Sequence, residues 1–376
     1  MKKIEFFRHN IDEKDIQRVR RVLRSIFLTT GEEVKAFEDD FSAYLGIRHT
    51  VGVTSCTAAL HLSVMALGIG PGDEVITTPM SFCATANAVL HAGAKPVFVD
   101  VEEETGNINA ELLEAAITKK TKAILPVHLY GQMCDMKTIR SIADRYKLLL
   151  IEDAAHAIEA SRDGVTVGQL TDAVCFSFYA TKNITSGEGG AISTHSGPLA
   201  DSLRMLRQHG IDKGAAERYT GRYRHWDMHL LGWKYNMDNV QAALLIGQLK
   251  RIESLWQKRE DLWRCYEEEL KQIKGIKLLK TLPGVKHARH LFTMLAPPDK
   301  RDSLLWELQE RDIGVAVNYR PIHLLRYYRK TFGYREGSFP VAEAIGNSTI
   351  SLPLYPSLGK TNVRYISKCL KSLVKK

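Results

Sequence analysis

Short hydrophobic runs alternate with amphipathic segments over the first half of the chain. Runs of strand length cover residues 50–54, 74–78, 96–101, 123–128, 148–153, 173–178 and 190–194. Between them, apolar residues recur every three or four positions, which is typical of helices, over 58–67, 83–91, 110–117 and 136–146. Repeated strand–helix–strand units predict an α/β fold with a seven-stranded, mostly parallel sheet and helices on both faces.

The remaining segments have a different pattern. Two helices are expected before the first strand, over 12–26 and 34–46, separated by the break Leu28-Thr-Thr-Gly31. Beyond residue 195 we expect a helix (199–208), a long loop (210–231), a helical run (238–270) and a tail with few strands and helices near 301–312 and 361–374. The chain therefore divides into a large domain, residues 1–240, and a bridging helix with a smaller α+β domain, residues 241–376.

The composition narrows the class of partner. The 376 residues are 44% hydrophobic and 25% charged, which suits a folded protein with a large core. A net charge of +9 favours an anionic partner. Because the basic residues are scattered rather than gathered in a block or stripe, we expect a phosphorylated substrate and no nucleic acid.

The cysteines and the hydrophobic runs indicate where the protein works. The six cysteines are widely spaced and contain no C-x-x-C pair, so we expect free thiols in a reducing cytoplasm and no metal site. The first residues lack the apolar core of a signal peptide, and no apolar run is long enough to span a bilayer. The sequence therefore predicts a cytoplasmic protein without a membrane segment.

Lys182 is the first candidate for chemistry. It follows the hydrophobic run 173–178 and precedes a glycine-rich turn, residues 187–190. Burial at the mouth of a strand lowers the pKa of a lysine and favours a neutral, nucleophilic amine. Such an amine can form a Schiff base with a carbonyl compound, including pyridoxal phosphate (PLP). A surface lysine at a strand end is the alternative.

Three further strand ends carry groups that suit PLP. The segment 54–59 places hydroxyl and small residues before a helix, where a phosphate can bind, although such residues also serve as simple N-caps. Asp153 can pair with a protonated pyridine nitrogen, or it can cap a helix or bind magnesium. Phe82 offers a ring for stacking on the pyridine, or it packs in the core. Ser177, five residues before Lys182, could join the phosphate contacts.

Taken together, these segments resemble the DegT/StrS-type family of PLP-dependent nucleotide-sugar aminotransferases. The resemblance covers nearly the whole chain and implies the fold-type I PLP transferase fold of the aspartate aminotransferase superfamily. The matching motifs are Leu28-Thr-Thr-Gly31, Gly70-x-Gly-Asp-Glu-Val-Ile76, Pro126-Val-His-Leu-Tyr-Gly131, Glu152-Asp-Ala-Ala-His156, Ser177-Phe-x-x-Thr-Lys182-Asn, Gly187-Glu-Gly-Gly190 and Gly232-x-Lys-Tyr-Asn236-Met.

The resemblance implies a role for each matching residue. Lys182 would bind PLP covalently and shuttle the proton, and Asp153 would pair with the pyridine nitrogen. Asn236 would reach across a homodimer interface to the partner's phosphate. The other implied cofactor contacts are His156 at the 3-hydroxyl, Phe82 on the ring, and Thr57, Ala58 and Ser177 at the phosphate. The implied substrate contacts are Thr29, Thr30, Tyr319 and His323.

The implied activity is transfer of an amino group from glutamate to a nucleotide-linked keto sugar. A UDP-linked 4-keto-6-deoxy sugar fits best, as in the biosynthesis of lipopolysaccharide or another surface polysaccharide. A 3-keto sugar on a dTDP carrier is an alternative, as is a non-sugar fold-type I enzyme such as an amino-acid aminotransferase or a cysteine desulfurase. A non-catalytic regulator or DNA-binding protein that keeps the fold but has lost turnover is a further alternative, against which the intact Lys182 and Asp153 argue.

Overall fold

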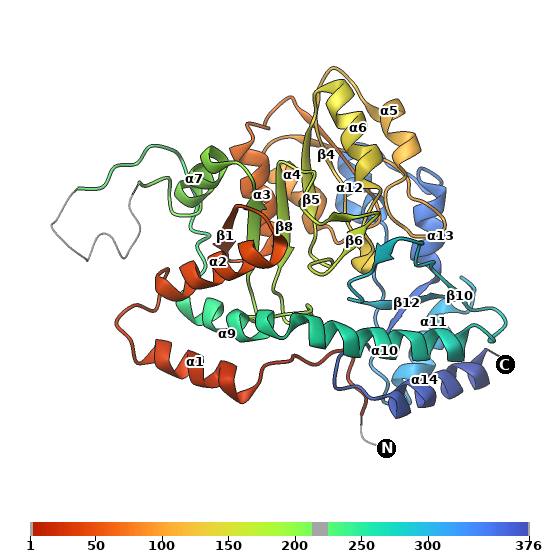
Figure 1. The fold of residues 1–376 in the computed structure, drawn as a ribbon. Coiled ribbons are helices and arrows are strands. Elements are labelled where there is room, and N and C mark those ends of the chain that lie inside the picture. The colour runs from red at the N-terminus through yellow and green to blue at the C-terminus, as the bar shows by residue number, and fades with distance from the viewer. Residues whose placement is uncertain (1–2, 213–224, 375–376) are drawn as a thin grey trace.

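A seven-stranded sheet lies at the centre of the computed structural model, which describes residues 3–212 and 225–374 (Figure 1). Six strands are parallel to one another, and the strand ending at Thr194 is antiparallel to both of its neighbours. This arrangement confirms the predicted mostly parallel α/β sheet. The order across the sheet is β1 (His49–Val53), β9 (Gly190–Thr194), β8 (Ala173–Ser177), β5 (Leu149–Asp153), β4 (Thr121–Leu125), β2 (Glu74–Thr77) and β3 (Lys95–Phe98).

Helices cover both faces of this sheet because successive strand residues point to opposite sides and both sides are apolar. One face packs against α3 (Cys56–Ala66), α4 (Ala84–His91) and α7 (Gly197–Leu206). The other packs against α2 (Glu32–Leu45), α5 (Leu113–Ala116) after the short η1 (Ala110–Leu112), α6 (Met136–Tyr146) and α9 (Asn239–Lys250). On this second face Phe41 meets Phe176 edge-on, with ring centroids 5.0 Å apart.

The predicted helical run 238–270 is two helices. Figure 1 shows α9 and α10 (Ile252–Leu270) running in line below the sheet, with a break at Arg251. The first helix, α1 (Glu13–Leu23), packs along α9. Arg251 side-chain nitrogens lie 2.7 Å from Asp15 and 3.0 Å from Asp12, so the break in the long run is also where α1 is attached.

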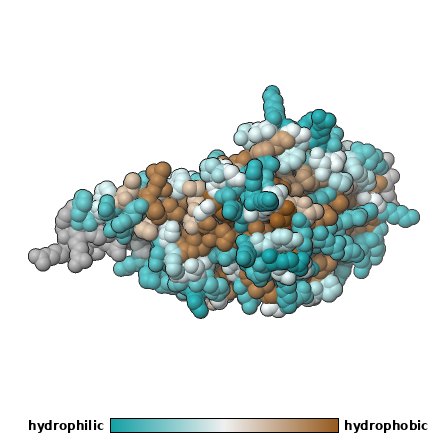
Figure 2. Space-filling model, turned by 90° about the horizontal axis from the view of Figure 1, so that it is seen from above, coloured by the Kyte–Doolittle hydropathy of each residue, from teal (hydrophilic) through white to brown (hydrophobic). Residues whose placement is uncertain are grey.

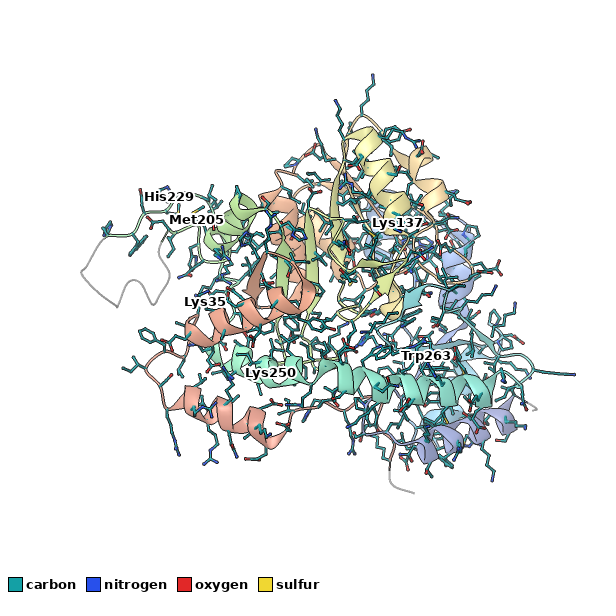
Figure 3. All side chains as sticks on the ribbon, in the orientation of Figure 1. Lys35, Lys137, Met205, His229, Lys250 and Trp263 are labelled. Atoms are coloured by element: carbon teal, nitrogen blue, oxygen red, sulfur yellow. The ribbon has the colours of Figure 1, made fainter. Side chains whose placement is uncertain are left out.

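A second hydrophobic cluster occupies the C-terminal part of the chain. Trp263 of α10 packs against Phe292, with ring centroids 4.7 Å apart (Figure 3). The N-terminal residue Ile4 lies in the same cluster and pairs with Ile313. The elements here are β10 (Lys277–Leu278), β12 (Phe292–Leu295) and β13 (Thr349–Leu352), which form one sheet, with α11 (Arg301–Gln309), η3 (Ile322–Leu324), α12 (Arg326–Phe332), α13 (Pro340–Ser348) and α14 (Lys360–Leu373). The domain boundary at residue 240 stays a prediction.

Two smaller features connect or extend these parts. A three-stranded sheet of β11 (Val285–Lys286), β6 (Ser161–Arg162) and β7 (Val165–Thr166) joins the segment before β12 to the segment after β5. The chain after α7 projects to the left in Figure 1; residues 213–224 of the predicted loop 210–231 lie outside the described residues. Over the ranges 3–212 and 225–374, no helix is long and apolar enough to cross a membrane.

Candidate active site

The carboxyl ends of β1, β5 and β8 meet at one edge of the sheet, and the predicted cofactor residues follow from them. Val53, Gly190 and Ser177 lie side by side across β1, β9 and β8. Asp153 ends β5 opposite Cys175. Because parallel strands all point the same way, the start of α3, the carboxylate of Asp153 and the turn after β8 share this edge.

Asp153 is the buried carboxylate of the site. Strand alternation turns the preceding Glu152 to the other face, where His128 Nε2 lies 2.7 Å from its carboxylate. Asp153 accepts hydrogen bonds from Thr85 Oγ1 at 2.8 Å and from the Ala155 N–H at 3.1 Å. Burial raises the pKa of Asp153, while these two bonds and the nearby Lys182 amine lower it. A carboxylate held in this way suits a cationic partner nitrogen.

Lys182 lies beyond β8 in the turn that follows, rather than on the strand itself. Its N–H donates to the carbonyl of Tyr179 at 2.9 Å, which closes the turn. The side chain is half-buried, and burial lowers the pKa of the amine to about 8. Nζ has no ion pair or hydrogen bond with any of the residues that the structure describes. The amine is therefore free to react and is partly neutral near neutral pH.

The start of α3 forms the phosphate candidate. Ser55 caps the helix, and its Oγ accepts from the Ala58 N–H at 3.1 Å. Within the described chain, the N–H groups of Cys56 and Thr57 have no such partner, so they suit an anion better than that of Ala58. Gly190 allows β9 to approach the start of α3 closely, because a Cβ at this position would lie 2.4 Å from the Ser55 carbonyl carbon.

Ser177 belongs to the same cradle. It is buried and pairs with Gly190 across β8 and β9, which places it beside the start of α3. Its Oγ accepts from the Tyr179 N–H at 3.4 Å. The hydroxyl proton remains available for a phosphate oxygen.

His156, Phe82 and Tyr319 are brought together in front of this edge. His156 lies in a turn after β5, where its Nδ1 accepts from the Tyr130 N–H at 3.2 Å. Burial lowers the pKa of His156 well below its ordinary value, so the ring is neutral and carries its proton on Nε2. That proton is donated to the hydroxyl oxygen of Tyr319 at 3.1 Å. The Phe82 ring lies 6.1 Å from that of Tyr319 and is 59% exposed, which leaves a face for a ligand ring.

Asn236, Thr29 and Thr30 form a second polar cluster. Asn236 precedes α9, which is capped by Asp238, and it pairs with Val53 along the edge of β1. Its amide nitrogen lies 2.8 Å from Thr30 Oγ1 and 3.5 Å from Thr29 Oγ1. The structure thus places a predicted cofactor residue beside two predicted substrate residues of its own chain.

His323 is not part of either cluster. Its side chain is fully buried in η3, with Nε2 2.9 Å from Glu343 and its ring 4.8 Å from that of Phe339. Nδ1 has no partner among the described residues. A role of His323 in substrate binding stays a prediction.

Several residues that shape the site had no role assigned from the sequence, although Tyr130 and Asn183 stand in the matching motifs. Thr85 holds Asp153, and Tyr130 holds His156 through its N–H and contacts the Asn318 carbonyl through its hydroxyl. Asn183, directly after Lys182, is buried and fully hydrogen-bonded, as described below. The available signal for Asn183 was its position as a polar residue directly after the candidate reactive lysine. Arg259 and His290 contact Asn183 from distant segments, and nothing in the local pattern indicates them.

A family model decides the relationship of this chain to known proteins. The model described as "DegT/DnrJ/EryC1/StrS aminotransferase family" matches residues 9–371. The chain belongs to this family. The resemblance read from the motifs, the fold class and the aminotransferase activity are thereby confirmed.

Three relatives illustrate the similarity. The spore coat polysaccharide biosynthesis protein SpsC of Bacillus subtilis is 42% identical over 371 residues, covering 97% of this chain and 95% of the relative. The UDP-4-amino-4-deoxy-L-arabinose–oxoglutarate aminotransferase of Shewanella sediminis is 37% identical over 375 residues, covering 97% and 96%. The solved PMP form of Spr1654 from Streptococcus pneumoniae is 32% identical, with a TM-score of 0.93 over 99% of each chain, and a PLP form is also known.

Proposed function

We propose that this sugar aminotransferase transfers the amino group of glutamate to a nucleotide-linked keto sugar, with a UDP-linked 4-keto-6-deoxy sugar as the substrate. Pyridoxal phosphate is the cofactor. The name of the Shewanella relative pairs a UDP-linked 4-amino sugar with oxoglutarate, the keto acid of glutamate. The observation that carries the proposal is the free Lys182 amine beside the buried Asp153 carboxylate.

The residues at the sheet edge fit PLP. Asp153 would hold the pyridine nitrogen, His156 would lie at the 3-hydroxyl and Phe82 would cover the ring. Thr57 and Ser177 would bind the phosphate, with Ala58 in the same helical turn. When bound, PLP withdraws electrons from the carbon that carries the amino group and so makes its proton removable.

The chain's own contribution is proton transfer and orientation. With a pKa of about 8, the Lys182 amine can take up a proton at neutral pH and return it. Lys182 would remove the proton from the carbon of the amino donor in the first half of the reaction, and in the second half it would deliver a proton to the sugar carbon that receives the amine. Tyr319 receives a hydrogen bond from His156, so its own hydroxyl proton points to another acceptor. One lysine serving both halves implies ping-pong kinetics.

A basic cavity supports the nucleotide part of the proposal. A cavity of about 690 Å³ is lined by Leu324, Gly333 and Tyr334 together with five cationic residues, Arg320, Arg326, Arg329, Lys330 and Arg335. These five form no ion pair with any side chain that the structure describes. Arg320 directly follows Tyr319, so the backbone connects the cavity lining to the candidate active site. Uncompensated positive charge of this kind attracts a diphosphate.

Exposed apolar residues support a homodimer. Ile26, shortly before Thr29 and Thr30 in the sequence, is 91% exposed, and Leu231, shortly before Asn236, is 80% exposed. Figure 2 shows hydrophobic residues on the projecting lobe, and exposed Met228 and Leu230 belong to the described part of that segment. An interface that covers them would place Asn236 at the contact with the partner, as the family resemblance implies.

Product analysis tests the proposed function. The PLP-loaded protein is incubated with glutamate labelled at its amino nitrogen and with one acceptor at a time. The acceptors are a UDP-4-keto-6-deoxy sugar, a dTDP-3-keto sugar and a set of keto acids. We expect labelled amino sugar, found by mass, from the UDP-linked 4-keto sugar. Labelled product only from the dTDP-3-keto sugar would mean that the enzyme aminates C3 rather than C4. Label found only in amino acids formed from the added keto acids would contradict a sugar substrate.

A further inference from the structure

Asn183, the residue after Lys182, makes five polar contacts while only 4% exposed. Its amide nitrogen lies 2.9 Å from each carboxylate oxygen of Glu159 and 2.9 Å from the carbonyl oxygen of Ala288. Its amide oxygen lies 3.1 Å from His290 Nδ1, and its backbone carbonyl accepts from Arg259 Nη2 at 3.2 Å. Every polar atom of the side chain is therefore engaged.

The partners of Asn183 come from three separate segments. Glu159 follows β5, Arg259 lies on α10, and Ala288 and His290 precede β12. Figure 3 shows the part of α10 concerned, between the labelled Lys250 and Trp263. The backbone next to Lys182 is thus held by both the large sheet and the C-terminal part of the chain. A contact network of this kind fixes the lysine more firmly than its own turn can.

His290 links Asn183 to the candidate cofactor residue His156. The two imidazole rings pack with centroids 4.4 Å apart. Because the Asn183 amide nitrogen faces acceptors, its oxygen faces His290, whose Nδ1 must carry the proton. Burial lowers the pKa of His290 well below its ordinary value, and the Lys182 charge acts in the same direction. His290 is therefore a neutral imidazole ring that lies between Asn183 and His156.

Glu159 contacts the side chain of Asn183, and Arg259 contacts its backbone carbonyl. They form no direct ion pair, yet both are buried, and each contacts Asn183. Burial raises the pKa of Glu159 to about 7 and lowers the pKa of Arg259 to about 10. Arg259 Nη1 has no partner among the described residues. A substitution of Asn183 would take the amide donor away from the buried Glu159 carboxylate, while Arg259 keeps its bond to the backbone carbonyl, so we expect the turn that carries Lys182 to rearrange on the Glu159 side.

We propose that Asn183 is a positioning residue that holds the Lys182 amine at the sheet edge, through its contacts with Glu159, Arg259 and His290. The proposal rests on the proposed function for the role of Lys182 as the reacting amine. It assigns Asn183 no contact with substrate or cofactor.

The test measures Lys182 in the protein without PLP. The rate at which acetic anhydride modifies Lys182 is followed against pH by peptide mass, and its midpoint reports the pKa of the amine. Wild type should give a midpoint near 8. Asn183→Ala should raise the midpoint by about one pH unit, because water enters when the turn loosens. Asn183→Ser gives the same readout if Asn183→Ala does not fold.

Tyr266→Phe is the control for a general loss of stability. It removes a buried hydrogen bond to the Pro353 carbonyl, 3.0 Å long, in the C-terminal cluster. This variant should unfold at a lower temperature but keep the wild-type midpoint for Lys182. An unchanged midpoint in both Asn183 variants, or an equal shift in Tyr266→Phe, would overturn the proposal.

Variants of Glu159 separate positioning from simple packing. Glu159→Gln keeps an oxygen that accepts from the Asn183 amide and should keep the midpoint, whereas Glu159→Ala should shift it as Asn183→Ala does. A shift of the same size in both would contradict the proposal. In the loaded enzyme, Asn183→Ala should lower kcat about tenfold or more with little change in the KM for glutamate, since proton transfer and not binding is impaired. If wild type transfers no amino group to any substrate while the Lys182 shifts occur as expected, the proposed function fails and the positioning role stands.

Discussion

The hydroxyl of Tyr319 lies 3.1 Å from Nε2 of His156, although the two residues are 163 positions apart in the chain. The family resemblance implies a cofactor role for His156 and a substrate role for Tyr319. Their hydrogen bond brings a candidate cofactor residue after β5 into contact with a candidate substrate residue before η3. Because the Tyr130 N–H donates to His156 Nδ1, the proton of the neutral His156 ring lies on Nε2 and points to the Tyr319 hydroxyl.

Asp153→Asn tests the electron sink. The amide fits the same space, since its oxygen can accept from the Ala155 N–H and its nitrogen can face Thr85. The charge that would hold a protonated pyridine nitrogen is lost, however. We expect turnover to fall by about 100-fold or more, as a missing partner of developing charge costs roughly 3 kcal/mol.

Asp172→Asn is the matched control for this change. Asp172 accepts from the Leu150 N–H at 2.7 Å, at the opposite end of β5. Its variant should keep near-normal turnover. An Asp153→Asn rate within about threefold of wild type, which corresponds to about 0.7 kcal/mol, would mean that Asp153 only caps the following turn.

Glu159 should make stability depend on pH. Its pKa in the folded protein is raised to about 7 from 4.5 by burial, so the protonated form is favoured on folding. The stability it provides is complete below the unfolded pKa and is lost as pH rises through the folded pKa. Between pH 5 and pH 8, wild type should lose roughly 2 kcal/mol of unfolding free energy that Glu159→Gln does not lose. Denaturant unfolding at both pH values measures this, and parallel pH profiles of the two proteins would contradict it.

Charge reversal in the basic cavity tests the nucleotide subsite. Arg329→Glu replaces an exposed cation that lines the cavity by an anion. The KM for the nucleotide-linked sugar should rise about tenfold, which is roughly 1.4 kcal/mol, and the increase should shrink at high salt. The half-reaction with glutamate, followed by absorbance, should not change. Lys371→Glu, the same charge change on α14, should leave both unchanged. An equal increase of the KM for the sugar in both variants would mean that the cavity acts only through the net charge of the protein.

Subunit mixing tests the role of Asn236. Lys182→Ala and Asn236→Asp should each be inactive, the second because a carboxylate repels the phosphate. If Asn236 completes the partner's site, a mixed dimer holds one site with both defects and one with neither. Activity should then return towards half of wild type per mixed dimer. Subunit exchange, verified by native mass, without recovered activity would mean that Asn236 serves its own chain, where it contacts Thr29 and Thr30.

Much of the fold follows from the local pattern of the sequence. The seven strands were predictable because hydrophobic runs buried on both faces are short and end in turn residues. The break at Arg251 was not, because no proline or glycine stands at or next to this position, and the ion pairs of Arg251 with Asp12 and Asp15 form only in the folded chain. The helices α12 and α13 were not foreseen either, since short elements stabilised by tertiary packing have weak periodicity.

The candidate site divides in the same way. Lys182, Asp153 and Ser177 lie at strand ends, where the topology of a parallel sheet brings residues together, so sequence reasoning could place them. The network around Asn183 could not be found, because Glu159, Arg259 and His290 meet only in three dimensions. The occupied N–H of Ala58 depends likewise on the rotamer of Ser55, which no pattern specifies.

The identity of the lysine that binds PLP tests the account most directly. The loaded protein is reduced with borohydride, digested, and the peptide that carries the phosphopyridoxyl group is identified by mass. We expect the label on Lys182, and we expect Lys182→Ala to lose transamination while it retains some PLP through the phosphate contacts of α3 and Ser177. A label on any other lysine, or undiminished transamination by Lys182→Ala, would contradict it.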